Sequence, residues 1–193
     1  MRVIAGNAGG LRLAVPKRGV RPTMDRVKAA IFSSLGEEVI GARVLDLFAG
    51  TGALGIEALS RGAGSALFVE DNSAAATMIE RNLARAKLEG RVRKQDAFAF
   101  LRSTQVPQPF RIIFADPPYE KTKGGEEFTR LLLGSRELFS MLEPAGIFVL
   151  EKHPAEKLPP APFWEVTRAR RYGATEVLFL QATEAAAEAR ARS

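Results

Sequence analysis

The chain has 193 residues, with 28 Lys and Arg against 22 Asp and Glu, a formal net charge of +6, and no cysteine. This length fits one domain that buries about 70% of its unfolded surface, and the lack of cysteine excludes disulfides, thiolate metal sites and a cysteine nucleophile. No apolar run approaches the roughly 20 residues of a membrane span and no signal-peptide pattern opens the chain, so we expect a cytoplasmic protein.

The first 28 residues carry the imbalance of charge. Seven basic residues stand there against one acid, and the other 21 basic and 21 acidic residues cancel. Alternation over residues 2–15 with Gly9-Gly10 at the turn predicts a β-hairpin, and helical spacing from Met24 to Leu35 predicts a helix after Thr23. Such a segment is typical of a docking surface for a polyanion, although a solvated arm without a partner has the same composition. The basic residues expected to contact the polyanion are Arg2, Arg12, Lys17, Arg18, Arg21 and Arg26.

Beyond residue 42 the apolar pattern alternates between strands and helices. The predicted elements are strand 43–48, helix 53–62, strand 65–70, helix 73–88, strand 91–94, helix 96–102, strand 111–115, helix 126–142, strand 147–151, and two antiparallel strands on either side of Tyr172-Gly173. Repeated βα units imply an α/β fold with a mainly parallel sheet and helices on both faces. We expect a single domain over residues 1–193, with residues 1–36 as a basic extension and residues 182–193 as a frayed helix or disordered tail.

A glycine-rich turn follows the first of these strands. Gly50, Gly52 and Gly55 form a GxGxxG pattern at a helix N-terminus, where the backbone can approach a ligand closely. Glu70 ends the next strand, 20 residues after Gly50, and is placed to bind ribose hydroxyls. This spacing fits a nicotinamide dinucleotide as well as another adenosine cofactor. Asp46 favours the latter, since a carboxylate repels a pyrophosphate but can hold the cationic amino acid portion of S-adenosylmethionine; its alternative role is to cap the turn.

Asp96 stands at the end of a third strand. Its carboxylate could accept a hydrogen bond from an adenine amino group while the backbone N–H of Ala97 meets a ring nitrogen. It could equally cap the helix that follows, and the two roles are compatible. With the turn and the two strand ends, the expected cofactor-binding residues are Asp46, Phe48, Gly50, Gly52, Glu70, Asp96 and Ala97.

The strand over residues 111–115 ends abruptly in Asp116-Pro117-Pro118-Tyr119. Asp116 supplies a carboxylate, the two prolines stiffen the turn and leave its carbonyls free to accept hydrogen bonds, and Tyr119 offers a flat face for stacking. Acceptors aimed at one point beside an aromatic face suit a planar amino group, such as the exocyclic nitrogen of a nucleobase. The alternative is a loop that follows a core strand without a catalytic role.

The order of these motifs resembles that of class I S-adenosylmethionine-dependent amino-methyltransferases, through VLDLFAGTGALG, then Glu70, Asp96 in KQDAFAF, and DPPY. The N-terminal segments RVIAG, GGLRLAVP and RPTMDRVKAAIF resemble the bacterial RsmD family, the 16S rRNA guanine-N2 methyltransferases. That family has an arginine where this chain has Lys28, and a second basic residue near Leu13. The resemblance implies a seven-stranded Rossmann-like methyltransferase fold and a loop guanine of 16S rRNA as the target, presented in a protein-bound or assembled small subunit.

In this interpretation Asp116 and the Pro117 carbonyl accept the two N–H groups of guanine N2, and Tyr119 stacks on the ring. Three alternatives are open. An adenine-N6 methyltransferase acting on DNA or RNA would use the same DPPY chemistry, but this chain has no additional target-recognition domain. A nicotinamide dehydrogenase leaves DPPY and Asp46 without a role, and a non-catalytic RNA-binding module leaves the cofactor motif without one.

Overall fold

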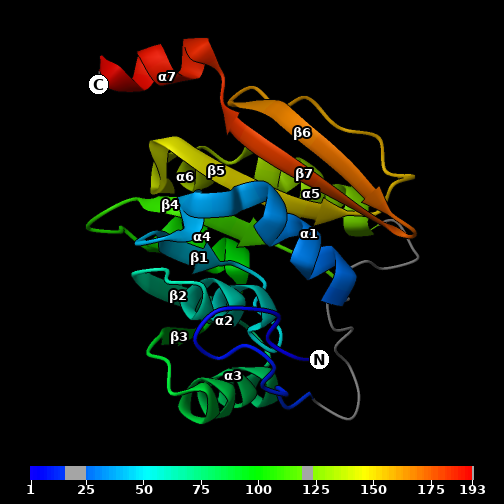
Figure 1. Ribbon diagram of the computed structural model, residues 1–193. Helices are drawn as coiled ribbons and strands as arrows, with labels where there is room; N and C mark the ends of the chain where they lie inside the picture. Colours follow the sequence, from blue (N-terminus) through cyan, green and yellow to red (C-terminus); the bar gives the residue numbers. More distant parts are fainter. Residues whose placement is uncertain (16–24, 119–123, 193) are drawn as a thin grey trace. The chain divides into compact units, whose positions relative to one another are not determined.

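The computed structural model describes residues 1–15, 25–118 and 124–192, and the chain divides into two compact units, Met1–Thr104 and Gln105–Ser193. The elements of each unit are shown in Figure 1. Among the described residues, no helix is both long enough and apolar enough to cross a membrane. The predicted N-cap Thr23 and the site residues Lys17, Arg18, Arg21 and Tyr119 lie outside the described ranges.

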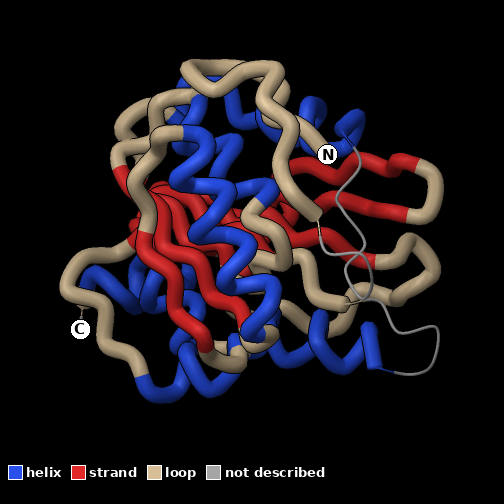
Figure 2. Tube along the Cα trace, turned by 90° about the horizontal axis from the view of Figure 1, so that it is seen from below, coloured by secondary structure: helices blue, strands red, loops and turns tan. Residues whose placement is uncertain are grey.

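Unit 1 holds a parallel sheet of three strands in the order β3-β2-β1. Register pairs Asp46 with Phe68 and Glu70 with Lys94, so the carboxyl ends of the strands lie at one edge of this sheet. Helices α2 and α3 pack against the strands (Figures 1 and 2). The elements from β1 onward are β1 (Arg43–Asp46), α2 (Ala53–Ser60), β2 (Ser65–Glu70), α3 (Ser73–Ala86), β3 (Arg91–Lys94) and α4 (Ala97–Ser103). The sequence predicted each of them to within two residues at either end.

The N-terminal part of unit 1 differs from the predicted hairpin. Residues 2–15 make only an isolated antiparallel bridge between Arg2 and Arg12, supported by hydrogen bonds from Val3 N–H to the Leu11 carbonyl and from Gly10 N–H to the Val3 carbonyl. The N–H groups of Ile4, Ala5 and Ala8 bond to side chains of α2, and that of Asn7 bonds to the Ser60 carbonyl, instead of to a partner strand. We call residues 1–15 the arm. After it come α1 (Asp25–Leu35), as predicted from its apolar spacing, and a short 3-10 helix, η1 (Gly36–Val39).

Unit 2 holds strands in the order β4-β5-β7-β6, with β4 and β5 parallel and β7 antiparallel to both of its neighbours. Its strands are β4 (Phe110–Ala115), β5 (Leu142–Lys152), β6 (Trp164–Tyr172) and β7 (Thr175–Ala182). The antiparallel pair β6–β7 confirms the prediction from sequence. Strand β5 begins five residues before the predicted strand 147–151.

The predicted helix 126–142 is two helices, α5 (Gly124–Gly134) and α6 (Arg136–Met141). Ser135 separates them because its backbone is extended and its hydroxyl accepts a hydrogen bond from Leu138 N–H at 3.0 Å, which makes it the N-cap of α6. The apolar spacing runs through this break, so periodicity alone could not locate it.

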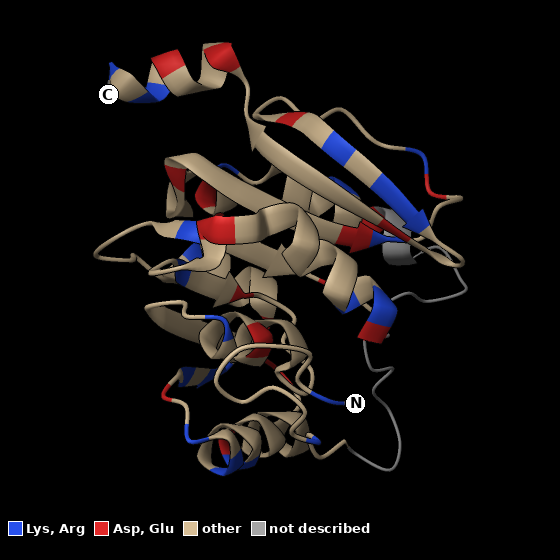
Figure 3. Ribbon diagram, viewed as in Figure 1, with Lys and Arg blue, Asp and Glu red and all other residues tan. Residues whose placement is uncertain are grey.

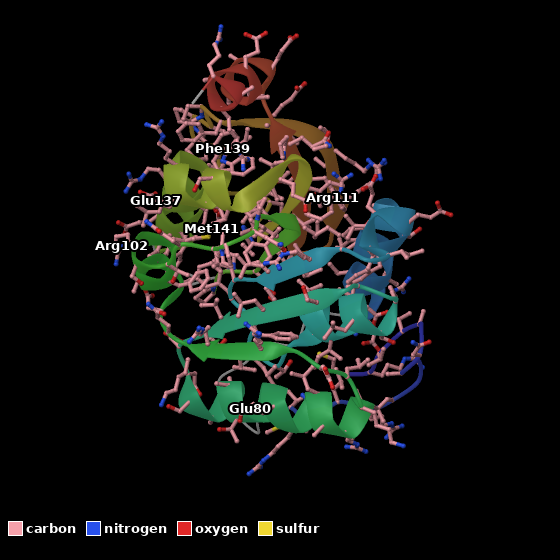
Figure 4. The ribbon with its side chains drawn as sticks, turned by 90° about the vertical axis from the view of Figure 1, so that its left-hand side faces the viewer. Glu80, Arg102, Arg111, Glu137, Phe139 and Met141 are labelled. Atoms are coloured by element: carbon pink, nitrogen blue, oxygen red, sulfur yellow. The ribbon has the colours of Figure 1, made fainter. Side chains whose placement is uncertain are left out.

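The chain ends in α7 (Glu184–Ala191), so the predicted frayed helix or disordered tail is helical over these residues. None of its residues is buried, as expected from its composition. Arg190 nevertheless reaches α6, where it donates to the carbonyls of Ser140 and Leu142 and lies over the ring of Phe139, which is labelled in Figure 4. An arginine at the last carbonyls of a helix satisfies groups that have no partner within that helix.

Strand β6 ends the sheet and is the most basic strand of unit 2. Arg168, Arg170 and Arg171 are all exposed, and Figure 3 shows blue bands of basic residues along this strand. Charged side chains on an edge strand discourage pairing with the edge of another sheet. Among the described residues, the strands of unit 1 are all parallel and those of unit 2 add an antiparallel C-terminal pair, in agreement with the predicted fold class.

Candidate functional site

The glycine-rich turn joins β1 to α2 through two glycines in the left-handed region, Gly50 at φ 55° and Gly52 at φ 80°. A Cβ atom on Gly52 would come within 2.9 Å of Ile56 Cδ1, and one on Gly55 within 2.3 Å of Phe68 Cε1. Gly52 is therefore required by its backbone conformation, and Gly55 by the close packing of α2 on β2. We call residues 47–52 the cofactor turn, because its backbone N–H groups stand at the N-terminus of α2.

Glu70 connects the end of β2 to this turn. Its Oε2 accepts a hydrogen bond from Gly50 N–H at 2.7 Å, and its Oε1 accepts one from Asn72 N–H at 2.8 Å. A carboxylate has about four lone-pair directions, so these two N–H bonds leave Glu70 with acceptor capacity for a hydroxyl, although the side chain of Asp71 also bonds to it. Burial raises the pKa of the Glu70 carboxyl above its ordinary value, the two N–H bonds oppose this effect, and neighbouring Asp71 reinforces it. This geometry fits a ribose hydroxyl.

Asp46 lies at the end of β1 and is 2% exposed. Its Oδ2 accepts a hydrogen bond from Gly55 N–H at 2.9 Å, which is the capping role weighed as its alternative. The bond ties the end of the strand to the first turn of α2 and holds a carboxylate beneath the cofactor turn. A role toward a cationic ligand group is compatible with this contact and stays a prediction.

Asp96 is exposed and is the N-cap of α4, accepting a hydrogen bond from Ala99 N–H at 2.8 Å, while Ala97 is buried. The half-buried rings of Phe48 and Phe98 meet edge to face here, with centroids 6.0 Å apart. Phe98 lies in the apolar run Ala97–Leu101, yet it is half-buried while its neighbour Phe100 is fully buried. Phe98 thus joins Phe48 as a candidate wall for an adenine ring.

The arm is attached to α2 by two buried side chains that the sequence analysis did not identify. Glu57 accepts hydrogen bonds from Ile4 N–H at 2.7 Å and from Ala5 N–H at 3.1 Å. The hydroxyl of Ser60 accepts one from Ala8 N–H at 3.0 Å and donates to the Ala5 carbonyl at 2.6 Å. The arm is therefore held against α2 by its backbone, and its residues Val3 and Leu13 are buried.

Of the basic residues in the N-terminal segment, Lys28 does not face solvent. Its side chain is fully buried, forms an ion pair with Glu57 at 3.2 Å, and donates to the Arg2 carbonyl. Its position four residues before Phe32 on the buried face of α1 was the available signal. Arg2, Arg12 and Arg26 are exposed as expected, and Arg2 pairs with Asp25 at 3.3 Å.

In unit 2, Asp116 and Pro117 directly follow Ala115, the last residue of β4. Asp116 is half-buried, Pro117 is buried and Pro118 is exposed. The register that pairs Ala115 with Leu150 places this turn at the carboxyl ends of the parallel pair β4–β5, where open α/β sheets bind ligands. In the described ranges no group of three or more His, Cys, Asp or Glu side chains could hold a metal ion.

Comparison with known proteins identifies the family. The family model described as Conserved hypothetical protein 95 matches residues 1–181. The Bacillus subtilis (strain 168) protein YlbH, named as an rRNA methyltransferase, is 39% identical over 92% of this chain and 96% of its own length. Escherichia coli (strain K12) ribosomal RNA small subunit methyltransferase D is 42% identical over 63% of this chain and 61% of its own. The chain belongs to the RsmD family.

Solved structures place RsmD family members among the class I methyltransferases. A methyltransferase from Escherichia coli, yhhF, has a TM-score of 0.79 and 35% identity, covering 94% of this chain and 97% of its own. The Thermus thermophilus 16S rRNA N2 G1207 methyltransferase RsmC, solved with AdoMet and guanosine, has a TM-score of 0.67 and 25% identity, covering 86% of this chain and 44% of its own. The predicted family and fold class are confirmed.

Proposed function

We propose that this RsmD family member transfers the methyl group of S-adenosylmethionine to the exocyclic N2 of a loop guanine in small-subunit (16S) rRNA. The observation that carries this proposal is the Asp116-Pro117 turn at the carboxyl end of β4, in a chain that also contains the cofactor turn and Glu70. The names of the relatives support rRNA as the substrate, and the guanosine bound by RsmC supports guanine. Since ribosomal RNA is the partner, we assign the enzyme to the cytoplasm.

In the proposed reaction, unit 1 binds the cofactor and unit 2 binds the target base. In unit 1, Glu70 binds the ribose hydroxyls, Asp96 and the Ala97 N–H recognise adenine, and Phe48 packs against its ring. The cofactor supplies an electrophilic methyl group when it is bound. In unit 2, Asp116 and the Pro117 carbonyl accept the two N–H groups of guanine N2. Its lone pair is then held out of conjugation with the ring and available for attack, so that catalysis rests mainly on positioning.

The target guanine must be accessible for this chemistry. In a base pair N2 is hydrogen-bonded to cytosine, so we propose an unpaired or flipped base, stacked on Tyr119. Asp116 or water accepts the proton that the methylated nitrogen releases. We propose a protein-bound or assembled small subunit as the substrate, because folded RNA fixes which loop guanine is presented.

Mapping of the product tests the proposal. Purified enzyme with isotope-labelled S-adenosylmethionine is incubated with free 16S rRNA and with small subunits that lack the modification, and the nucleosides are identified by mass spectrometry. We expect label only in N2-methylguanosine, with more in the assembled substrate. Label in N6-methyladenosine would support the alternative of an adenine-N6 methyltransferase, and no label in RNA would reject both.

Replacing Glu70 with alanine should weaken S-adenosylmethionine binding by about 1–3 kcal/mol, because the ribose hydroxyls lose a charged acceptor. The raised pKa adds a dependence on pH: as the pH falls through it, the carboxylate becomes neutral and affinity should decrease. Calorimetry as a function of pH measures both effects. Asp71→Asn is the matched control, which should move the loss of affinity to lower pH because it removes a neighbouring charge that raises the pKa of Glu70. Unchanged affinity in Glu70→Ala would show that Glu70 only orders the turn.

The same pKa shift acts in the opposite direction on the stability of the unliganded protein. Because the folded state binds the proton of Glu70 more readily than the unfolded chain does, the contribution of this group to stability increases as the pH falls through its folded pKa. This contribution stops increasing once the pH is below the pKa that Glu70 has in the unfolded chain. Cofactor affinity and apo stability should therefore respond oppositely to mild acid.

Neutralising the exposed arginines Arg2, Arg12 and Arg26 together should reduce the salt dependence of RNA binding. For every phosphate that the variant no longer binds, the slope of log affinity against log salt should decrease by about 0.7 for a single strand. These substitutions are preferable to a deletion of residues 1–20, which would remove the partners of Glu57 and disturb the core. Arg81→Ala, at an exposed position on α3, is the control. An unchanged slope in the triple variant would place the RNA surface elsewhere.

A further inference from the structure

Asn82 on α3 is a fully buried amide whose hydrogen bonds serve two other segments of unit 1. Its Oδ1 accepts from Ala14 N–H at 2.8 Å, and its Nδ2 donates to the Ala14 carbonyl at 3.1 Å. The same Nδ2 donates to the Thr51 carbonyl at 3.1 Å. Both protons of the amide are therefore used, one on the arm and one on the cofactor turn.

The contact with Ala14 has the pattern of a strand pair, since the side chain satisfies both backbone groups of one residue. Only an amide can do this while also donating to a second carbonyl. A carboxylate lacks the donors, and an apolar side chain would leave two partly buried groups of Ala14 and the buried Thr51 carbonyl without this partner. Thr51 is 2% exposed and lies between Gly50 and Gly52, so its carbonyl belongs to the backbone that is proposed to face the cofactor.

Among the described residues, Glu57 and Ser60 are buried side chains that hold the arm by bonds outside the cofactor turn, whereas the hydroxyl of Thr51 in the turn donates directly to Met1 Sδ of the arm at 3.6 Å. Ser60 bonds to Ala5 and Ala8, and Glu57 bonds to Ile4, Ala5, Lys28 and Arg61. Helix α2 therefore holds the start of the arm, whereas Asn82 holds its end and the turn with one group. Asn82 therefore anchors the arm with a bond to the turn, and Ser60 anchors the arm without one.

We propose that Asn82 is a positioning residue that couples the RNA-binding arm to the cofactor turn, so that RNA and the adenosine cofactor bind cooperatively. This inference rests on the proposed function. A ligand that fixes the turn fixes the Thr51 carbonyl, which holds the Asn82 amide in the orientation that bonds to Ala14. RNA that fixes the arm favours the same orientation from the other side, and by linkage the two effects on affinity are equal.

The coupling is measured with S-adenosylhomocysteine, which binds without reacting, and a 16S rRNA substrate. RNA affinity with and without the nucleoside should differ by about fivefold or more in the wild-type protein, and nucleoside affinity with and without RNA by the same factor. Asn82→Asp keeps the size and the acceptor but places an oxygen against the carbonyls of Ala14 and Thr51, so the factor should fall well below the wild-type value, while the Thr51–Met1 contact still joins the arm to the turn. Ser60→Ala loosens the arm without touching the turn, and should weaken RNA binding while the factor stays near the wild-type value.

Amide hydrogen exchange gives a second measurement that needs neither RNA nor a variant. Adding S-adenosylhomocysteine to the wild-type protein should slow exchange at Ala14 N–H, although this residue lies outside the proposed cofactor contacts. The coupling would be overturned if RNA and the nucleoside did not change each other's affinity in the wild-type protein, or if they did so equally in Asn82→Asp. Unchanged exchange at Ala14 N–H would overturn it as well. If the nucleoside binds and RNA does not, the proposed function fails while the exchange experiment still decides the link. If the nucleoside does not bind, both fail.

Discussion

Replacing Asp116 with alanine is expected to lower the rate of methyl transfer roughly a hundredfold or more, about 3 kcal/mol in the barrier, as for the loss of one preorganised polar group. The substitution removes an acceptor from the guanine amino group, so the nitrogen keeps its conjugated, planar form and remains a poor nucleophile. Asp116 follows β4 in unit 2, whereas the cofactor turn and the arm belong to unit 1. Cofactor and RNA affinities should therefore change comparatively little, and the loss should be confined to the transition state.

Single-turnover kinetics with saturating cofactor and RNA measure this effect directly. Asp116→Asn provides the graded comparison, because its amide oxygen still accepts one hydrogen bond but has no charge, and its rate should fall between those of the wild-type and alanine proteins. A near wild-type rate for Asp116→Ala would remove the central support for the proposed mechanism. So would a loss of activity explained entirely by lost cofactor binding or folding.

Replacing Lys28 with methionine is expected to destabilise the protein by about 3 kcal/mol, at the lower end of the range for breaking a buried ion pair. Methionine has a similar length but leaves the fully buried Glu57 without its ammonium partner. The loss is limited because Glu57 retains the N–H groups of Ile4 and Ala5 and the guanidinium of Arg61 at 2.8 Å. For a chain of this size the midpoint of thermal unfolding should fall by roughly 6–12 °C.

Arg26→Met is the matched control, because Arg26 has the same charge on the same helix but is exposed. Its effect on the free energy of unfolding should be within about 0.5 kcal/mol of zero, as for most surface substitutions. Lys28→Arg should retain most of the stability, since a guanidinium can form the same pair and the RsmD family resemblance places an arginine there. Equal melting of the Lys28→Met and Arg26→Met proteins would show that the buried pair contributes no net stability.

The sequence predicted the cofactor half of the fold closely because its signals there are local. The GxGxxG turn needs glycine at positions where the backbone enters the left-handed region, and both Gly50 and Gly52 do so. Glu70 could be placed because parallel strands bring their carboxyl ends to one edge, and the structure joins Glu70 to Gly50 directly. Local patterns of this kind require no knowledge of distant contacts.

The contacts that the sequence did not reveal join residues far apart in the chain. Glu57 and Asn82 lie within apolar-periodic helices and resemble ordinary polar positions, yet they bond to backbone groups 53 and 68 residues away. For the same reason the alternating pattern of residues 2–15 predicted a full hairpin, whereas only one bridge forms and the N–H groups of Ile4, Ala5 and Ala8 bond to side chains of α2. The total charge of the N-terminal segment likewise concealed that Lys28 is buried.

The attachment of the arm by its main chain has a consequence for natural variation. Glu57 and Ser60 bind N–H and carbonyl groups of Ile4, Ala5 and Ala8, which every residue other than proline provides in full. Homologues can therefore diverge at these three positions and still keep the arm in place. Gly6 is the exception, because a Cβ atom there would come within 1.8 Å of the Ser60 carbonyl oxygen. The path of the arm can thus persist while its exposed side chains change.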